Sequence, residues 1–440
     1  MFRPRVLLIA EHANPEWQSV PLEGWSHGRA LAEVADVHVV TQVRNRDAFL
    51  RAGLVEGRDF TAIDSEAVAA RLYKLASAVR GGQGKGWTTM SALGTLSYYW
   101  FERLLARQLG SRLRGGEFDL VHRITPLSPT TPSLLAGFCR RAGVPFVLGP
   151  LNGGVPWPAG FDDVRRKERE WLSYVRGAYR LLPGHGATRR NAAAILVGSR
   201  DTFLQVDARW RDKCVYVPEN AVDPGRFSAC VEGPVTRPIR LVFTGRLVPY
   251  KGADMLIEAA APLVREGSVA IDVLGDGPEM ARLRAQAEQA GAAGGVHFHG
   301  WVPHTEVQER MVRGDVFAFP SIREFGGAVV LEAMALGLVP VVVAYGGPAE
   351  LVTDATGHAI PIRPRGQIVA GLRTTLEGIV ADPSGLRARG RRARQRVLDL
   401  FTWQAKARQC LEVYRWVLGD RPDRPDFGMP LPDPPFEEDA

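Results

Sequence analysis

The chain has 440 residues, 45% of them hydrophobic, with 55 Lys and Arg against 48 Asp and Glu. This length and apolar content exclude a small disulfide-stabilised module and predict a globular protein of about two domains. The four cysteines lie far apart without metal-ligand spacing, which is typical of a protein in a reducing compartment. The formal net charge of +7 would suit nucleic acid, but no nucleic-acid motif accompanies it, so we expect no such partner.

The first half of the chain reads as short apolar strands separated by loops and helices. The first expected strand covers residues 5–10, a loop follows over 11–25, and a helix begins near Ser26. This pattern predicts one doubly wound α/β domain over residues 1–232. The further strands are expected at 36–41, 119–122, 145–150, 194–199 and 213–218.

Two cations follow the first strand of the second half. Residues 239–246 read as a buried strand that ends at Gly245, and Arg246 and Lys251 come directly after it. Ligands of open α/β sheets bind beyond the carboxyl ends of the strands. Arg offers a planar fork and Lys a point charge, and both suit a diphosphate. The alternative is a pair of solvated surface cations, which are common in a basic protein.

The order strand, turn, helix recurs from residue 239 to residue 362. The strand at 270–274 runs into a tight turn that contains Asp276 and Gly277, and a further strand and loop cover 296–302. This recurrence predicts a second doubly wound domain over residues 237–400. Beyond it, residues 420–440 form a Pro-rich acidic tail, which we expect to be loosely held.

The most informative segment runs from Val316 to Ala335. An apolar strand leads into a loop in which Glu324 and Glu332 are separated by seven residues, with Gly326 and Gly327 at the start of a helix. A glycine turn before a helix N-terminus favours anions, because free backbone N–H groups point outward there. The two carboxylates repel phosphate but accept hydrogen bonds from sugar hydroxyls. The segment therefore predicts a nucleotide-sugar site; the alternative is an exposed helix with two ordinary Glu residues.

These motifs resemble the retaining glycosyltransferases of family 4, which have the GT-B fold. The resemblance is carried by the Glu324 and Glu332 spacing, by Arg246 and Lys251, and more weakly by residues 219–227. It implies two Rossmann-like domains that face each other across a cleft, with the N-terminal domain over 1–232 completed by a C-terminal helix at 403–418. It also implies that Glu324 contacts the transferred sugar, that Glu332 contacts the ribose, and that Arg246 and Lys251 hold the diphosphate. Glu324, Arg246 and Lys251 are thus the expected catalytic residues.

The same resemblance implies a wider donor site and the kind of donor. The donor is expected to be a UDP- or GDP-linked sugar that acts as a co-substrate, with no other cofactor. No Asp-x-Asp motif occurs, so no metal ion is implied. Besides Glu332, the expected donor-binding residues are Gly245, Asp276, Gly277, Trp301, Val302, Phe325, Gly326 and Gly327.

One departure from the family concerns a loop that carries a histidine in many relatives. Here the corresponding residues 149–154 contain no histidine, and Asn152 stands among glycines. His12 and His122 are candidates to fill that space; the alternative is that each is an ordinary loop or strand histidine. Together with Glu11 and Asn152, they are the residues expected to bind the acceptor.

Positive charge and aromatic residues gather in two segments, 98–114 and 165–190. Such segments suit an anionic membrane surface, with Trp100, Phe101, Trp171 and Tyr174 as interfacial anchors. The alternative is a helix pair packed on the first domain with solvated arginines. The N-terminal apolar run is too short for a signal peptide, so we expect a cytoplasmic protein with peripheral contact at the inner face of the plasma membrane as one possibility.

The combined expectation is a metal-independent, retaining glycosyltransferase of the hexosyltransferase type. It would move a sugar from a nucleotide-diphosphate sugar to a glycan or polyprenyl-linked glycan, in surface polysaccharide or glycoconjugate biosynthesis. Two alternatives stay open. One is a GT-B-like nucleotide-sugar epimerase, and the other is a non-catalytic subunit that only binds the nucleotide sugar.

Overall fold

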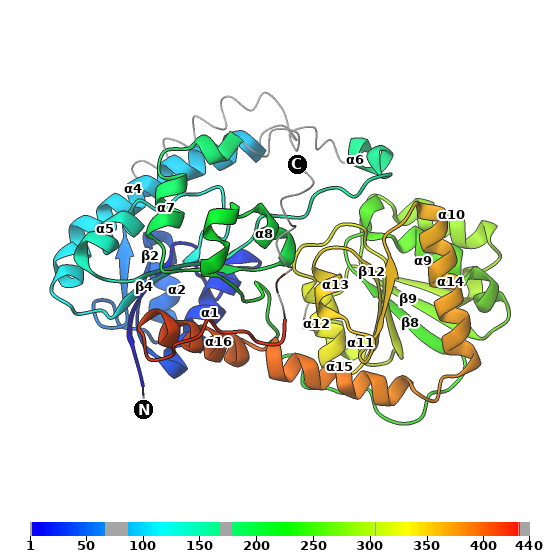
Figure 1. Ribbon diagram of the computed structural model, residues 1–440. Coiled ribbons are helices and arrows are strands. Elements are labelled where there is room, and N and C mark those ends of the chain that lie inside the picture. Colours follow the sequence, from blue (N-terminus) through cyan, green and yellow to red (C-terminus); the bar gives the residue numbers. More distant parts are fainter. Residues whose placement is uncertain (1, 67–86, 168–177, 304, 430, 432–440) are drawn as a thin grey trace. The chain divides into compact units, whose positions relative to one another are not determined.

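The computed structural model describes residues 2–66, 87–167, 178–303, 305–429 and 431 (Figure 1). The chain forms two compact units. The first comprises residues 1–153, 172–219 and 406–440, and the second comprises residues 154–171 and 220–405. The domain boundaries expected from the sequence stay a prediction.

A sheet of seven parallel strands forms the centre of the first unit, in the order β3-β2-β1-β4-β5-β6-β7. Strands β4, β5 and β6 are buried along their whole length, as expected for a parallel sheet covered by helices on both faces. The expected strand at 5–10 is confirmed, whereas β3 was not predicted. The strands are β1 Arg5–Ala10, β2 Asp36–Gln42, β3 Phe60–Ile63, β4 Leu120–Thr125, β5 Phe146–Leu151, β6 Ala194–Val197 and β7 Cys214–Tyr216.

The α-helices that accompany this sheet in the sequence include one that begins earlier than expected. Helix α1 begins at Val20 rather than near Ser26, and Pro21 in its first turn suits a helix start because its missing N–H group would have no partner there. The helices are α1 Val20–Val34, α2 Arg46–Arg51, α4 Trp87–Arg114, α5 Leu135–Ala142, α7 His185–Asn191, α8 Arg200–Gln205 and α16 Trp403–Val417. Helix α6, Asp162–Lys167, belongs to the second unit.

Helix α4 buries one face in the first unit. Tyr98, Phe101 and Leu105 are at most 1% exposed and follow the three- and four-residue spacing of one helix face. The prediction that Phe101 anchors a membrane is therefore wrong, because its ring belongs to the core. Trp171 and Tyr174 lie outside the described residues. In the part of the chain that the structure describes, no helix is long and apolar enough to cross a membrane.

The second unit contains a sheet of six parallel strands in the order β10-β9-β8-β11-β12-β13. Its strands are β8 Ile239–Thr244, β9 Val269–Leu274, β10 Val296–Gly300, β11 Val316–Phe319, β12 Val339–Ala344 and β13 His358–Pro361. The α-helices between and after them are α9 Ala253–Arg265, α10 Met280–Gln289, α11 Val307–Met311, α12 Ala328–Ala335, α13 Gly347–Leu351, α14 Arg365–Ala381 and α15 Leu386–Leu400. The predicted strands at 316–319 and 339–344 are confirmed.

Each sheet reverses its strand order at one place. In the first sheet the reversal lies between β1 and β4, and in the second it lies between β8 and β11. At such a switch point the helices that follow the two strands lie on opposite faces, so the carboxyl ends of these strands are left open to ligands. The fold therefore marks one position in each unit where a site is expected.

The start of the C-terminal tail is packed rather than loose. Met429 is 4% exposed, and the Arg424 guanidinium donates to the carbonyl oxygens of Arg211 and Asp212 at 3.4 and 3.3 Å. The expectation of a loosely held arm is thus wrong for residues 420–429. Residues 432–440 lie outside the described residues.

Candidate active site

The switch point of the second unit joins two residues that the sequence predicts to be catalytic. Lys251 ends a short 3₁₀ turn, Pro249–Lys251, in the loop after β8, and Glu324 lies in the loop after β11. The Lys251 ammonium group forms an ion pair with Oε2 of Glu324, and the two side chains are 17% and 22% exposed. Because solvent screens a half-buried pair less than an exposed one, this contact fixes both side chains at the carboxyl edge of the sheet.

Aromatic rings surround the charged end of Lys251. Its Nζ lies 5.2 Å from the ring centroid of Phe319, the last residue of β11, and 5.6 Å from that of Tyr250. Both distances are within the range of cation–π attraction. The lysine is therefore positioned by the strand end as well as by Glu324.

Arg246 lies beside a close approach of two loops. A Cβ atom on Gly275 would collide with the Gly245 carbonyl oxygen, so the loops after β8 and β9 touch backbone to backbone. The Leu247 amide donates to the Asp276 carbonyl oxygen at 2.9 Å and extends this contact. Asp276 and the Arg246 side chain are exposed, and among the described residues no ion pair holds Arg246. The structure thus brings the predicted Gly245 and Asp276 together next to an available cation.

The loop after β11 leads into helix α12 through Gly327. This glycine caps the helix with φ of 60°, a conformation that glycine adopts without strain. Glu332 follows in the second turn and is half-buried. A Cβ on Gly326 would collide with the Asn220 side-chain amide, so Asn220 packs directly on this loop. Phe325 is half-buried in the same loop, whereas Trp301, after β10 and next to Val302, is 73% exposed.

A short segment of the second unit contacts the residues that precede the ion pair. The guanidinium carbon of Arg323 lies 4.8 Å from the centroid of the Trp157 ring, and its Nε donates to the Val155 carbonyl oxygen at 3.2 Å. The Trp157 ring meets the ring of Tyr250 edge-on, with centroids 6.1 Å apart. Sequence reasoning missed this contact. Its one signal is a tryptophan between two prolines, a stiff segment in a glycine-rich loop.

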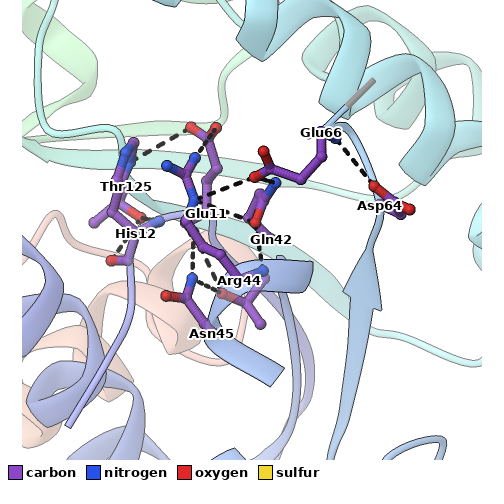
Figure 2. A network of polar contacts seen from close by, with 9 residues as sticks. Glu11, His12, Gln42, Arg44, Asn45, Asp64, Glu66 and Thr125 are labelled. Atoms are coloured by element: carbon purple, nitrogen blue, oxygen red, sulfur yellow. Dashed lines mark hydrogen bonds and ion pairs between the residues drawn. The ribbon is translucent and has the colours of Figure 1, made fainter. Parts of the chain in front are cut away.

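The switch point of the first unit holds a network of polar side chains (Figure 2). Glu11 and His12 follow β1, and the His12 amide donates to Oγ1 of Thr125, the last residue of β4, at 3.1 Å. The Glu11 side chain is 5% exposed, and its carboxylate lies 3.5 Å from Nδ1 of His12 and 4.0 Å from Nη2 of Arg44. The predicted Glu11 and His12 are therefore neighbours at the expected edge of the sheet.

Buried polar residues after β2 support this network. The Asn45 side-chain amide donates to the Glu11 carbonyl oxygen and to Oγ1 of Thr41, both at 2.9 Å. Oε1 of Gln42 accepts from the Arg44 amide at 2.6 Å and from Arg44 Nε at 3.1 Å. Thr41, Gln42 and Asn45 are at most 1% exposed. Sequence reasoning missed them, although polar residues directly after a predicted strand were a usable signal.

His122 and Asn152 are engaged inside the first unit. His122 is fully buried on β4, with Nδ1 2.7 Å from the Tyr414 hydroxyl and Nε2 2.7 Å from the Gly149 carbonyl oxygen. Burial lowers the pKa of this imidazole to about 3. The prediction that His122 binds the acceptor is wrong, because both ring nitrogens are used within the core. The Asn152 amide donates to Oε2 of Glu219 at 2.6 Å, and burial raises the pKa of that carboxyl group to about 8.

Comparison with known proteins agrees with this geometry. The family model for glycosyl transferases group 1 matches residues 231–389. WcaL of Salmonella typhimurium, named as a colanic acid biosynthesis glycosyltransferase, is 30% identical over 329 residues, which cover 64% of this chain and 74% of WcaL. The chain belongs to the group 1 glycosyltransferases. This confirms the resemblance to family 4.

Two further proteins are similar to this glycosyltransferase, one in sequence and one in fold. A glycogen synthase of Mycobacterium tuberculosis is 31% identical over 245 residues, 52% of this chain and 58% of the synthase. The chain spans less than two thirds of the length of the curated relatives it matches first. The structure of HepE from Anabaena, in complex with UDP, covers 93% of this chain and 98% of its own, with a TM-score of 0.57 and 17% identity. This likeness confirms the GT-B fold.

Proposed function

We propose that this glycosyltransferase transfers a hexose, with retention of anomeric configuration, from a nucleotide-diphosphate sugar to a glycan or polyprenyl-linked glycan. The observation that carries the proposal is the ion pair of Lys251 and Glu324 at the switch point of the second unit, where Arg246 follows the same strand as Lys251. One cation there is available, and the other is held by a carboxylate that a ligand can replace. Such an arrangement suits a ligand with both a diphosphate and hydroxyl groups.

The diphosphate would bind between the two cations and the start of helix α12. Arg246 and Lys251 offer charged hydrogen bonds, and the first-turn N–H groups of α12 add their partial positive charge. When Lys251 turns to the diphosphate, Glu324 becomes free to accept hydrogen bonds from the sugar. These groups offset the charge of the leaving diphosphate without a metal ion, which supports metal-independent transfer. That HepE binds UDP is a property of that protein, and it favours a nucleotide donor here.

The roles of the two carboxylates follow from their places in the loop and helix. Glu324 shares an ion pair with a residue of the diphosphate site and would hold the transferred sugar. Glu332 lies in the second turn of helix α12 and would hold the ribose of a UDP- or GDP-linked donor. The first unit would bind the acceptor, with Glu11 and His12 in the network of Figure 2.

A lipid-linked acceptor would bring the protein to a membrane surface from the cytoplasmic side. Arg103, Arg107 and Arg114 are exposed on helix α4, and they supply the positive charge that such contact needs. Flotation with anionic and with neutral vesicles tests this part. Salt-sensitive binding to anionic vesicles is expected, and its absence at low salt would leave a glycan that is not lipid-linked as the acceptor.

A thermal-shift screen tests the donor class most quickly. UDP, GDP, ADP and the corresponding nucleotide sugars are compared at about 100 times their Kd, where specific binding adds about 2.7 kcal/mol to the free energy of unfolding. We expect one base to stabilise the protein, and its nucleotide sugar to release nucleoside diphosphate when acceptor is added. Conversion of the nucleotide sugar without acceptor would indicate an epimerase instead, and binding without any turnover would indicate a non-catalytic subunit.

A further inference from the structure

We propose that the network around Glu11 binds the terminal ring of the acceptor, and that it selects a neutral or amine-bearing polyhydroxylated ring over one with a carboxylate or phosphate. The inference rests on the proposed function, since it names the chemical class of the acceptor. It is carried by three observations: a buried carboxylate with only long contacts to His12 and Arg44, a polar network that holds its backbone, and an excess of carboxylates around it among the described residues (Figure 2).

The carboxylate of Glu11 is the first observation. Its side chain is 5% exposed, and its nearest partner among the described residues is Nδ1 of His12 at 3.5 Å, a distance longer than a usual hydrogen bond. Nη2 of Arg44 lies 4.0 Å away, at the limit of an ion pair. Buried carboxylates are normally hydrogen-bonded, because leaving one without partners is costly. Two vicinal hydroxyl groups of a sugar would supply the missing donors in one step.

The floor of the site is the second observation. Asn45 and Thr41 donate to the carbonyl oxygen of Glu11, and Gln42 accepts from both the backbone and the side chain of Arg44. A buried polar network contributes little net stability compared with an apolar core of the same shape. It does hold the residues above it in one geometry, which is what a binding site requires. A role in ligand binding therefore explains the network better than a contribution to the stability of the fold.

The balance of charge is the third observation. Among the residues that the structure describes, Arg44 is the one Lys or Arg side chain paired with Glu11, and its Nε also lies 4.0 Å from Glu66. The side-chain amide of Gln42 donates to the same Glu66 carboxylate. The backbone amide of Glu66 donates to Oδ1 of Asp64 at 3.0 Å. Within the described part of the network, three carboxylates thus face one guanidinium, and that guanidinium also donates to Gln42. A carboxylate or phosphate on the ligand would meet repulsion here, whereas hydroxyl or ammonium groups would be attracted.

The test measures binding of methyl glycosides to the full-length protein saturated with its nucleoside diphosphate. The panel contains the methyl glycosides of glucose and galactose, of glucosamine and galactosamine, and of glucuronic and galacturonic acid, titrated by saturation-transfer NMR. We expect at least one neutral or amino glycoside to bind ten times more tightly than its uronic acid counterpart. Three results would overturn the proposal: equal binding of the neutral, amino and acidic glycosides that share a ring configuration, preference for the acids, or no binding of any member of the panel.

Two variants locate the selectivity. Glu11→Gln keeps the shape of the side chain and should reduce the tenfold preference to threefold or less, and Glu66→Gln should reduce it in the same direction. Glu16→Gln is the matched control, because Glu16 lies in the same loop but pairs with Arg51 at the surface. Parental selectivity in both Glu11→Gln and Glu66→Gln would contradict the proposal. Affinity for the nucleoside diphosphate reports separately on the proposed function and shows that each variant is folded.

Discussion

At the scale of single residues, the central feature is the ion pair that Lys251 and Glu324 form in the loops after β8 and β11. Each side chain has a partner that a ligand can replace, so the pair links the binding of a diphosphate to the release of a carboxylate. A lysine fixed by an aromatic ring at 5.2 Å and by a carboxylate can change partner without changing position. Binding the diphosphate and freeing Glu324 would then be one event.

The two carboxylates are expected to differ in which part of the donor they hold. Glu332→Ala should weaken binding of the bare nucleoside diphosphate, because it would remove the proposed contact to the ribose. Glu324→Ala should leave that affinity within a few fold of the parent and reduce transfer by about 10²–10³, the usual effect of losing one transition-state contact. Calorimetric titration and a product-release assay measure the two effects. An equal loss of nucleotide affinity in both variants would contradict the assignment.

His122 makes a prediction about stability rather than activity. Burial lowers the pKa of its imidazole to about 3, whereas an unfolded histidine has a pKa of about 6.5. Between these values the unfolded state binds the extra proton, so the stabilising effect is complete above pH 6.5 and is lost as the pH falls. At pH 5 the loss for this one group is on the order of 2 kcal/mol.

Denaturant unfolding of the parent at pH 7.5 and at pH 5 measures this loss. His122→Gln should be less stable at pH 7.5 but should show a smaller difference between the two pH values. His297→Gln is the control, because His297 is exposed. If His122→Gln and the parent lose the same amount of stability on acidification, His122 is not the cause.

At the scale of elements, strands were the easiest part to predict from the sequence. The predictions for β1, β11 and β12 agree with the structure because apolar runs end there at polar residues, Gly or Pro. Strand β3 escaped prediction because four residues give too little periodicity to distinguish a strand from a loop. The start of α1 was missed because Pro21 and Gly24 lie in its first two turns, and both residue types are typical of loops.

The residues of the two candidate sites also differ in how well the sequence could predict them. Lys251 and Glu324 could be found because each follows a clear strand, and the carboxyl ends of parallel strands meet at one edge. The network around Glu11 draws on Gln42, Arg44 and Asn45, whose relation to Glu11 depends on which strands are neighbours. Local pattern does not determine strand order, so these residues could not be assigned before the fold was known.

The segment with Trp157 gives a prediction at this scale. Trp157 lies between Arg323 and Tyr250, which directly precede Glu324 and Lys251, so it is expected to be a positioning residue for the ion pair. Trp157→Ala should lower kcat about tenfold or more with little change in the unfolding temperature. Trp157→Phe keeps an aromatic face for Arg323 and should restore most of the rate.

Steady-state kinetics of donor turnover measure this effect. Trp210→Ala is the control, because the Trp210 ring also faces an arginine, Arg209 at 5.9 Å, but lies in the first unit outside the expected donor site. A role confined to folding would lower the unfolding temperature in both Trp157 variants and leave kcat per folded molecule unchanged. Parental kcat in Trp157→Ala would show that the segment does not position the pair.

At the scale of the whole molecule, two doubly wound units each present one switch point, and the two positions differ in their charge. The second unit offers Arg246, Lys251 and a helix start together with Glu324, whereas the described residues of the first offer three carboxylates around one arginine. This contrast is expected of an enzyme that binds an anionic donor in one unit and a polyhydroxylated acceptor in the other. Membership of the group 1 glycosyltransferases, shown by the comparison with WcaL, is consistent with such a division.

The central claim is that Arg246 and Lys251 hold the diphosphate of a nucleotide sugar in the second unit. Calorimetric titration of UDP and GDP into the parent, Arg246→Ala, Lys251→Ala and the control Arg282→Ala, at an exposed arginine of α10 paired with Glu279, tests it most directly. A charged hydrogen bond contributes about 1.5–3 kcal/mol, so each of the first two variants should bind the preferred nucleotide at least tenfold more weakly, with the control unchanged. Parental affinity in both variants, for a nucleotide that the parent binds, would contradict the account.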